Sequence, residues 1–236
     1  MNANSHLNKL AQEIQNLPVE QVQSTCPQAS SQRAFPRTVL FTVFVVSGSS
    51  ALLYQMVWQR SLLNIYGSNV ESVAMVVAAF LAGLGFGSLL GGQLSSLESF
   101  PLITGFACCE LGAGAYGLVS LDLFRWAGAA TTIGSSPLLV GCMAFALVFL
   151  PTLLMGATLP MLVEHQVRAT MSVGSSVSLL YCVNTLGGAI GALAAVHLIL
   201  GSLGMSGTVR LAAMLNLLVA LVVLVSAKLM PARNGS

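Results

Sequence analysis

Six long apolar segments follow one another along this chain, and they restrict its possible folds more than any other feature. Each is at least as long as the roughly 20 apolar residues that a helix needs to cross a bilayer. Inside lipid the backbone must pair its polar groups within the segment, which a helix does. We therefore predict an all-α integral membrane protein whose six transmembrane helices lie at residues 38–58, 70–94, 101–123, 137–162, 174–200 and 207–229.

Composition supports this class of protein and excludes others. Only 7% of the 236 residues are charged, whereas an ordinary soluble domain carries about 25%. So few charges cannot supply the polar surface of a soluble enzyme, and they are too few to keep a chain disordered in water. A net charge of +2 spread over nine Lys and Arg residues forms no basic patch, so we expect no nucleic-acid partner. The composition therefore predicts that the chain's partner is the lipid bilayer in which it lies.

Two polar tails flank the predicted membrane domain of residues 38–229. Residues 1–37 contain a short amphipathic helix that Ser5 can cap, followed by a linker rich in Gln, Ser and Pro. The apolar stripe of that helix could dock on a protein partner, lie on the bilayer surface, or belong to a helix that is only marginally stable. Residues 230–236 form the C-terminal tail. The stripe consists of Leu7, Leu10, Ile14 and Leu17.

Basic residues at the ends of the segments predict the orientation. Cytoplasmic loops carry an excess of Lys and Arg, and more of these residues fall on the side of the N-terminus than on the other side. We therefore expect both termini in the cytoplasm. Short connections also predict that consecutive helices are antiparallel neighbours. The basic residues counted are Lys9, Arg33, Arg37, Arg168, Lys228 and Arg233 on one side, and Arg60, Arg125 and Arg210 on the other.

Glycines recur at intervals of four in the second and fifth segments. Gly83, Gly87 and Gly91 form one ridge, and Gly187 and Gly191 form another. No strand or acidic residue accompanies the first ridge as a dinucleotide site requires, so we interpret both as close helix-packing surfaces. They could serve a protein partner or a homo-oligomer. Because the two segments hold equivalent places, the ridges also suggest two repeats of three helices.

One acid, Glu110, falls midway along a predicted span. An ionised carboxylate at that depth is costly, so it should face the bundle interior and be protonated, paired, or reachable by a cation. We consider a functional role and a structural role equally. Tyr116, Tyr181 and Asn184 also lie at membrane depth and are candidate neighbours in a substrate site, although hydrogen bonding between helices is the commoner role of such residues.

Charged and aromatic side chains gather near the predicted non-cytoplasmic ends of the helices. The charges could pair to form a gate, or they could anchor the helices at the interface. Tyr54 and Trp58 are of the types that favour interfacial depth. The candidate gating or interface charges are Arg60, Glu71, Asp122, Arg125 and Arg210.

No catalytic constellation is apparent. The sequence shows no nucleophile beside a base and no phosphate-binding loop, and its five cysteines lack the spacing of a zinc site. We expect neither enzymatic activity nor a cofactor or metal.

Five ordered stretches of the chain form a recognisable set. They are SGSSALLYQMVWQR at 47–60, AAFLAGLGFGSLLGGQL at 78–94, ELGAGAYGL at 110–118, PTLLMGATLP at 151–160 and YCVNTLGGAIGALAA at 181–195. Together they resemble the membrane domain of bacterial spermidine-synthase-like membrane proteins. That resemblance implies a fold like half of a major-facilitator transporter, commonly fused to a soluble aminopropyltransferase domain, and a bacterial cytoplasmic membrane.

The chain departs from that family in two ways. It stops at Ser236, soon after the sixth segment, so we expect no transferase activity from it. Gln93 and Leu94 follow the double glycine of the second segment, where the family has charged residues, so a charged gate is not expected there.

Two hypotheses about function follow. The first is a transporter-like module that binds or moves a small cation such as a polyamine, with Glu110 as the acid that exchanges a proton for it. The second is a non-catalytic subunit that anchors, scaffolds or assembles a larger membrane complex. The polar N-terminal tail and the glycine ridges favour the second hypothesis.

Overall fold

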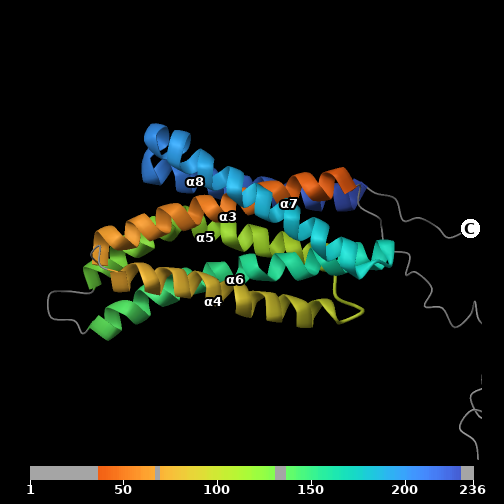
Figure 1. Ribbon diagram of the computed structural model, residues 1–236, viewed down its shortest axis with the longest axis horizontal. Coiled ribbons are helices and arrows are strands. Elements are labelled where there is room, and N and C mark those ends of the chain that lie inside the picture. The colour runs from red at the N-terminus through yellow and green to blue at the C-terminus, as the bar shows by residue number, and fades with distance from the viewer. Residues whose placement is uncertain (1–36, 67–69, 131–136, 230–236) are drawn as a thin grey trace, which may run out of the picture. The chain divides into compact units, whose positions relative to one another are not determined.

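The computed structural model describes residues 37–66, 70–130 and 137–229, and all long elements in these ranges are helices (Figure 1). The predicted helix of the N-terminal tail and residues 230–236 lie outside the described residues. The all-α prediction is confirmed for the described part. The elements are α3 (Arg37–Tyr66), α4 (Val70–Ser95), α5 (Leu102–Ala130), α6 (Pro137–Thr170), α7 (Val173–Ala194), the π-helix η1 (Ala195–Ile199) and α8 (Leu200–Leu229).

Several helices continue past the predicted spans. The α3 helix ends at Tyr66 and α6 at Thr170, each eight residues beyond the predicted boundary, and α5 also runs on to Ala130. The predicted boundaries followed hydropathy, which falls where polar residues begin. Polar residues such as Gln and Arg are good helix formers, so the helices do not stop there.

Five helical stretches are long and apolar enough to cross a membrane, and the last of them is a continuous run of 57 residues, Val173–Leu229. Six separate spans are therefore not confirmed. This last run contains both the fifth and the sixth predicted segments. As a straight rod it would be about 85 Å long, far more than the roughly 30 Å of hydrocarbon in a bilayer.

The run is not straight, because the chain reverses at Gly204. This glycine has φ 63° and ψ −174°, a conformation that favours glycine because a side chain would be strained there. Gly191 packs on Ser49, and Asn216 is hydrogen-bonded to the neighbouring Ser50. A straight helix would place residues 191 and 216 about 37 Å apart. Because both residues contact the same short segment of α3, the chain must turn back between them. Figure 1 shows the reversal at its upper left.

Both glycine ridges pack against other helices of the same chain. A Cβ added to Gly87 would meet the Leu153 backbone of α6, and one added to Gly187 would meet the Val45 backbone of α3. Thus α4 lies along α6, and α7 lies along α3. The expectation that consecutive helices are neighbours is wrong for α4 and α5, since α5 packs chiefly on α8 and α6. Close backbone approach at glycine, not loop length, selects these partners.

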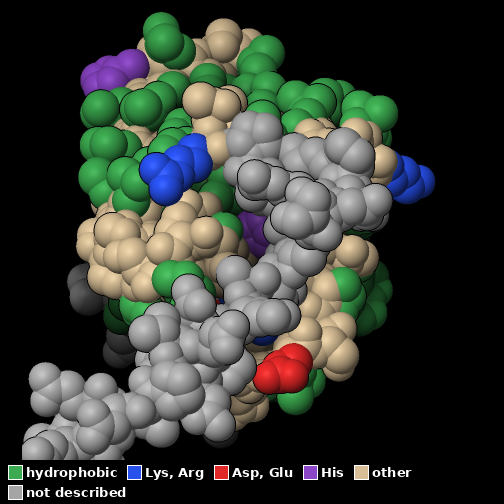
Figure 2. Space-filling model, turned by 90° about the vertical axis from the view of Figure 1, so that its right-hand side faces the viewer, with side chains coloured by type: hydrophobic (Ala, Val, Ile, Leu, Met, Phe, Trp, Pro, Cys, Tyr) green, Lys and Arg blue, Asp and Glu red, His purple; other side chains and the backbone are tan. Residues whose placement is uncertain are grey.

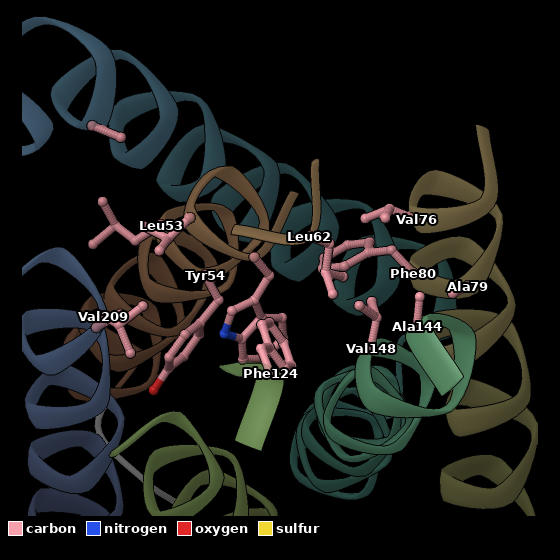
Figure 3. Packing of buried hydrophobic residues seen from close by; sticks show 14 of the residues in the cluster. Leu53, Tyr54, Leu62, Val76, Ala79, Phe80, Phe124, Ala144, Val148 and Val209 are labelled. Atoms are coloured by element: carbon pink, nitrogen blue, oxygen red, sulfur yellow. The ribbon is translucent and has the colours of Figure 1, made fainter. Parts of the chain in front are cut away.

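One cluster of buried hydrophobic residues contains several aromatic side chains (Figure 3). Tyr54 and Trp58 are completely buried in it, with ring centroids 4.8 Å apart, and Phe124 meets the Trp58 ring edge-on at 6.2 Å. The interpretation of Tyr54 and Trp58 as interfacial anchors is therefore wrong. Their spacing of four residues places both on the inner face of α3.

The outer helix faces are strongly apolar. Large exposed side chains line the outside of α4 and α7, while serine, asparagine and glutamate side chains are buried between helices. Charged side chains are sparse in the end-on view of Figure 2. This arrangement suits a lipid environment, where apolar surface need not be hidden. The exposed residues include Leu81, Phe86, Leu89, Leu186, Ile190 and Leu193.

Candidate functional site

The site is organised by a serine-rich segment of α3, residues 47–50. The Ser47 hydroxyl donates a hydrogen bond of 2.5 Å to Oε1 of Glu110 on α5. Glu110 is only 2% exposed, and its second oxygen, Oε2, has no hydrogen-bond partner among the described residues. Glu110 thus lies inside the bundle with a hydrogen bond to only one of its two carboxyl oxygens.

Two asparagines complete what we call the polar cluster, namely Ser47, Ser50, Glu110, Asn184 and Asn216. The Ser50 hydroxyl is within hydrogen-bond distance of the Asn216 side-chain oxygen on α8 and also of the Ser47 carbonyl, at 2.8 Å. Asn184 on α7 lies against Gly48, because a Cβ added there would be 2.8 Å from the Asn184 side-chain oxygen. One segment of α3 therefore meets polar groups from α5, α7 and α8.

Small side chains are the local reason for this convergence. Gly48 and Ser49 let α7 approach closely, and the Ser49 hydroxyl donates to the Gly187 carbonyl at 2.7 Å. Serine hydroxyls can also bond to their own helix, as Ser49 does to Val45 at 2.9 Å, so the segment stays helical while offering oxygen atoms to its neighbours.

Of the candidate neighbours of Glu110, the structure brings Asn184 to the same segment of α3 but not the two tyrosines. The Tyr116 hydroxyl donates to the Leu147 carbonyl of α6 at 2.5 Å, which ties α5 to α6. Tyr181 is 60% exposed and lies on the outer face of α7. Tyr116 thus has the interhelical role that is common for buried tyrosine, and Tyr181 lies outside the cluster.

Residues that the sequence reasoning missed are Ser47, Ser50 and Asn216. Asn216 lies near the middle of the sixth predicted segment and is 2% exposed, so the criterion that selected Asn184 would have selected it too. The serines gave a weaker signal, since serine is also common in helix packing without a polar partner.

The candidate gating charges do not assemble into one gate within the described residues. Asp122 and Arg125 pair with each other along α5, and both side chains are more than 70% exposed. Arg60 lines an open pocket beside Met56 and Leu200. Arg210 is exposed. Glu71 belongs to α4, but its side chain lies outside the described part of the chain.

A charge does reach the connection after α4, although Gln93 and Leu94 supply none. Arg168 on α6 donates to the Ser95 carbonyl at 2.7 Å and pairs with Glu164 at 2.8 Å. It thereby satisfies a carbonyl at the C-terminal end of α4, where a cation is favourable. The position of Arg168, one helix turn from Glu164, gave no sign of this contact in the sequence.

The chemistry open to the polar cluster is cation or proton binding. It offers one unpartnered carboxylate oxygen together with serine hydroxyls and amide oxygens. Within the described ranges, no group of three or more His, Cys, Asp or Glu side chains is placed to hold a metal ion.

Comparisons find no protein-family model that matches the chain, no similar curated protein and no similar solved structure. The resemblance to the spermidine-synthase-like membrane proteins therefore stays a prediction.

Proposed function

We propose that this chain is a transporter-like membrane module that binds and moves a small cation at Glu110. The observation that carries the proposal is the second carboxylate oxygen of Glu110, which is buried and without a partner among the described residues. A buried carboxylate in a membrane helix is favoured when a proton or a cation accompanies it. The Ser47 hydroxyl beside it would orient the carboxylate toward that cation.

The cation class follows from the residues and from the resemblance together. A protonated amine can be held by one carboxylate oxygen and nearby hydroxyl or amide oxygens. The polar cluster supplies these groups, and the resemblance points to a polyamine. In an exchange, Glu110 would be an ionised carboxylate paired with an ammonium group of the amine in one state and a protonated, neutral carboxyl in the other, so the buried site would carry no net charge in either state.

We further propose that the membrane domain has six crossings arranged as two repeats, α3–α5 and α6–α8. Matched close contacts support this. Gly48 packs on Asn184, and Gly156 packs on Leu84 in the same manner. Adding 108 to the number of a residue in α3 gives its equivalent in α6, as Gly48 corresponds to Gly156. Adding 100 to the number of a residue in α4 gives its equivalent in α7, as Leu84 corresponds to Asn184.

The same differences relate two further pairs of contacts. Gly87 packs on Leu153, and its equivalent Gly187 packs on Val45. Gly91 packs on Ala157 as Gly191 packs on Ser49, again with unchanged differences. A constant relation in three independent contacts is what a repeat produces, because the second helix of each half then packs on the first helix of the other.

The third helices match with a difference of 106, which pairs Glu110 with Asn216. Both are buried polar residues that bond to the serine-rich segment of α3. Transporters built from repeats have their binding sites where the repeats meet near the membrane midplane, which is where this proposal places the polar cluster. The buried pairs that support the match are Leu102 with Thr208, Phe106 with Ala212, Ala107 with Ala213, Ala113 with Val219, Gly114 with Ala220 and Gly117 with Val223.

For orientation, we propose a bacterial cytoplasmic membrane with both termini in the cytoplasm. The start of α3, the end of α6 and the end of α8 lie at one end of the bundle (Figure 1), and Arg37, Arg168 and Lys228 lie in these segments. Cations at that end accord with the excess of basic residues on the cytoplasmic side.

The test is uptake into vesicles that contain the purified chain. Labelled spermidine and a pH-sensitive dye report amine entry and proton exit for the wild type, for Glu110→Gln and for Asp122→Asn as the matched control. The control removes an exposed carboxylate from the same helix. We expect at least a tenfold loss of both signals for Glu110→Gln and wild-type signals for the control. Equal uptake by all three proteins would overturn the role of Glu110, and no uptake by the wild type would overturn transport.

The packing around Glu110 supports a second candidate, a static subunit of a larger membrane complex. A Cβ added to Gly117 would collide with the Tyr54 ring, and the space over Gly48 is filled by Asn184. Such close packing suits a scaffold. The glycine ridges, by contrast, are already covered within the chain, so a partner would bind another surface.

Isolation in mild detergent separates the two candidates. A monomer that binds spermidine in a Glu110-dependent way supports the transporter. Co-purification of a defined protein complex, lost when residues 1–20 are deleted, together with no spermidine binding, supports the subunit.

A further inference from the structure

A pocket of about 260 Å³ lies at the end of the bundle where α3 begins, α6 ends and α7 begins. This is the end that faces the viewer in Figure 2. Helix ends of a membrane bundle lie near the level of the lipid headgroups. The pocket is lined by the polar residues Arg37, Gln166, Thr170, Ser172, Ser175 and Ser176 and by apolar residues that include Phe41 and Leu180.

The first feature of this pocket is positive charge without a balancing acid. Arg37 lines it and is exposed, and no aspartate or glutamate of the described residues lines it. Within the described part of the chain Arg37 has no ion pair. A guanidinium group in this setting favours an anion and repels an amine.

The second feature is the uncapped N-terminus of α7. Ser172 precedes the helix in an extended conformation, but its side chain makes no capping hydrogen bond. In the described residues, no hydrogen bond reaches the amides of residues 173–175, whereas the Ser176 amide bonds weakly to the Ser172 carbonyl at 3.4 Å. The first-turn amides and the helix dipole therefore offer unpaired positive groups to an anion.

The third feature is an amide donor without a partner on a mostly buried residue. Gln166 lines the pocket and is only 8% exposed as a whole, yet no hydrogen bond within the described residues involves its side-chain amide. The amide atoms are not among the fully buried unpartnered atoms, so they reach the open space of the pocket. Gln166 is therefore an independent polar group, held in place by burial, that can donate to a ligand there.

We propose that the pocket binds a phosphate group, with an anionic phospholipid headgroup as its source. Arg37 would neutralise the charge, while Gln166 and the first-turn amides of α7 would donate hydrogen bonds to phosphate oxygens. The Ser175 hydroxyl bonds to Ser172 at 2.7 Å and can turn toward the ligand instead. Phe41 and Leu180 also line the pocket and give it an apolar part against which an acyl chain can pack.

This site is independent of the proposed cation site. Its charge has the opposite sign, and its residues come from the ends of α3, α6 and α7 instead of the serine-rich segment in the middle of α3. Loss of spermidine transport would leave the phosphate site untouched, and the reverse also holds.

The experiment measures thermal unfolding of the full chain in detergent with added phosphatidylglycerol, phosphatidylcholine or inorganic phosphate. The test variants are Arg37→Gln, which removes the charge, and Gln166→Glu, which keeps the size of the side chain and adds a carboxylate that repels phosphate. Lys228→Gln is the matched control, because Lys228 is an exposed cation near the same end of the bundle but does not line the pocket.

We expect phosphatidylglycerol to raise the Tm of the wild type and of Lys228→Gln by several degrees, and phosphatidylcholine to do so far less. Both test variants should need at least ten times more phosphatidylglycerol for the same shift. If inorganic phosphate alone stabilises the wild type but not the test variants, the site is upheld and its source is soluble phosphate. Equal responses of Arg37→Gln, Gln166→Glu and the wild type, or equal shifts with both lipids, would overturn the proposal.

Discussion

Ser47 and Ser50 are one helix turn apart on α3 but serve different neighbours. Ser47 bonds to the acid of α5, and Ser50 pairs with the asparagine of α8. Each hydroxyl thereby satisfies one polar group that would be costly if left alone between helices. The Ser47 contact is the more consequential of the two, because Glu110 has no other partner among the described residues.

Replacing Ser47 by alanine should therefore destabilise the protein. The change leaves both oxygens of Glu110 without a hydrogen bond and should lower the free energy of unfolding by about 1–3 kcal/mol. Unfolding in detergent, followed by circular dichroism, measures it. Ser178→Ala is the control, since Ser178 is exposed and bonds only to its own helix. An unchanged stability of Ser47→Ala would mean that Glu110 does not depend on this hydroxyl.

At this scale the sequence predicts the acid but not its surroundings. Glu110 is conspicuous because an acidic side chain within an apolar membrane segment is energetically costly and therefore rare. Which serine, tyrosine or asparagine reaches it depends on how the helices are rotated and paired, and short polar side chains occur on several faces. Tyr181 had the expected chemistry and depth, yet it faces outward.

Among the helices, the glycines of α4 form two groups. Gly83, Gly87 and Gly91 touch α6, whereas Gly85 and Gly92 have open space where a Cβ would be. The spacing of four residues predicted the ridge correctly as a packing surface, because residues four apart share a face. The partner helix could not be predicted, since α6 and α3 both offer small residues to a ridge.

Gly87→Val and Gly85→Val form a matched pair of variants in this helix. Valine at position 87 would force the Leu153 backbone away, and overpacking of this kind costs about 1–3 kcal/mol or more. A Cβ added at position 85 would meet nothing within 4 Å, so valine there should change stability by less than about 0.5 kcal/mol. Unfolding curves of the two variants, measured in detergent solution, compare their stabilities. Similar losses in both variants would show that valine acts through helix propensity and not through the α4–α6 contact.

Across the whole bundle, the reversal at Gly204 determines how many times the chain crosses the bilayer. Hydropathy predicted two segments there, and the structure holds both in one helical run with a break. The break was not predictable in detail, because glycines at 201, 204 and 207 are all candidates and a π-helix just before them shifts the register.

Cysteine labelling from outside the cell tests the crossing number. In a variant without the five native cysteines, single cysteines replace Ser96, in the connection after α4, and Ser202, beside the reversal; both positions are exposed. We expect a membrane-impermeant maleimide to label only Ser202→Cys in intact cells and both variants after lysis. Failure to label Ser202→Cys in intact cells, with labelling after lysis, would contradict separate crossings by α7 and α8.

The position of α3 has a consequence for synthesis in the cell. This helix is the first of the described elements to leave the ribosome, yet it packs along α7 and α8, which are made last. Until more than a hundred further residues have been translated, its serine-rich face has no permanent cover, and such long-range pairing is slow. The nascent α3 should therefore wait beside the insertion machinery or a chaperone, so that assembly of the bundle is completed only after translation ends.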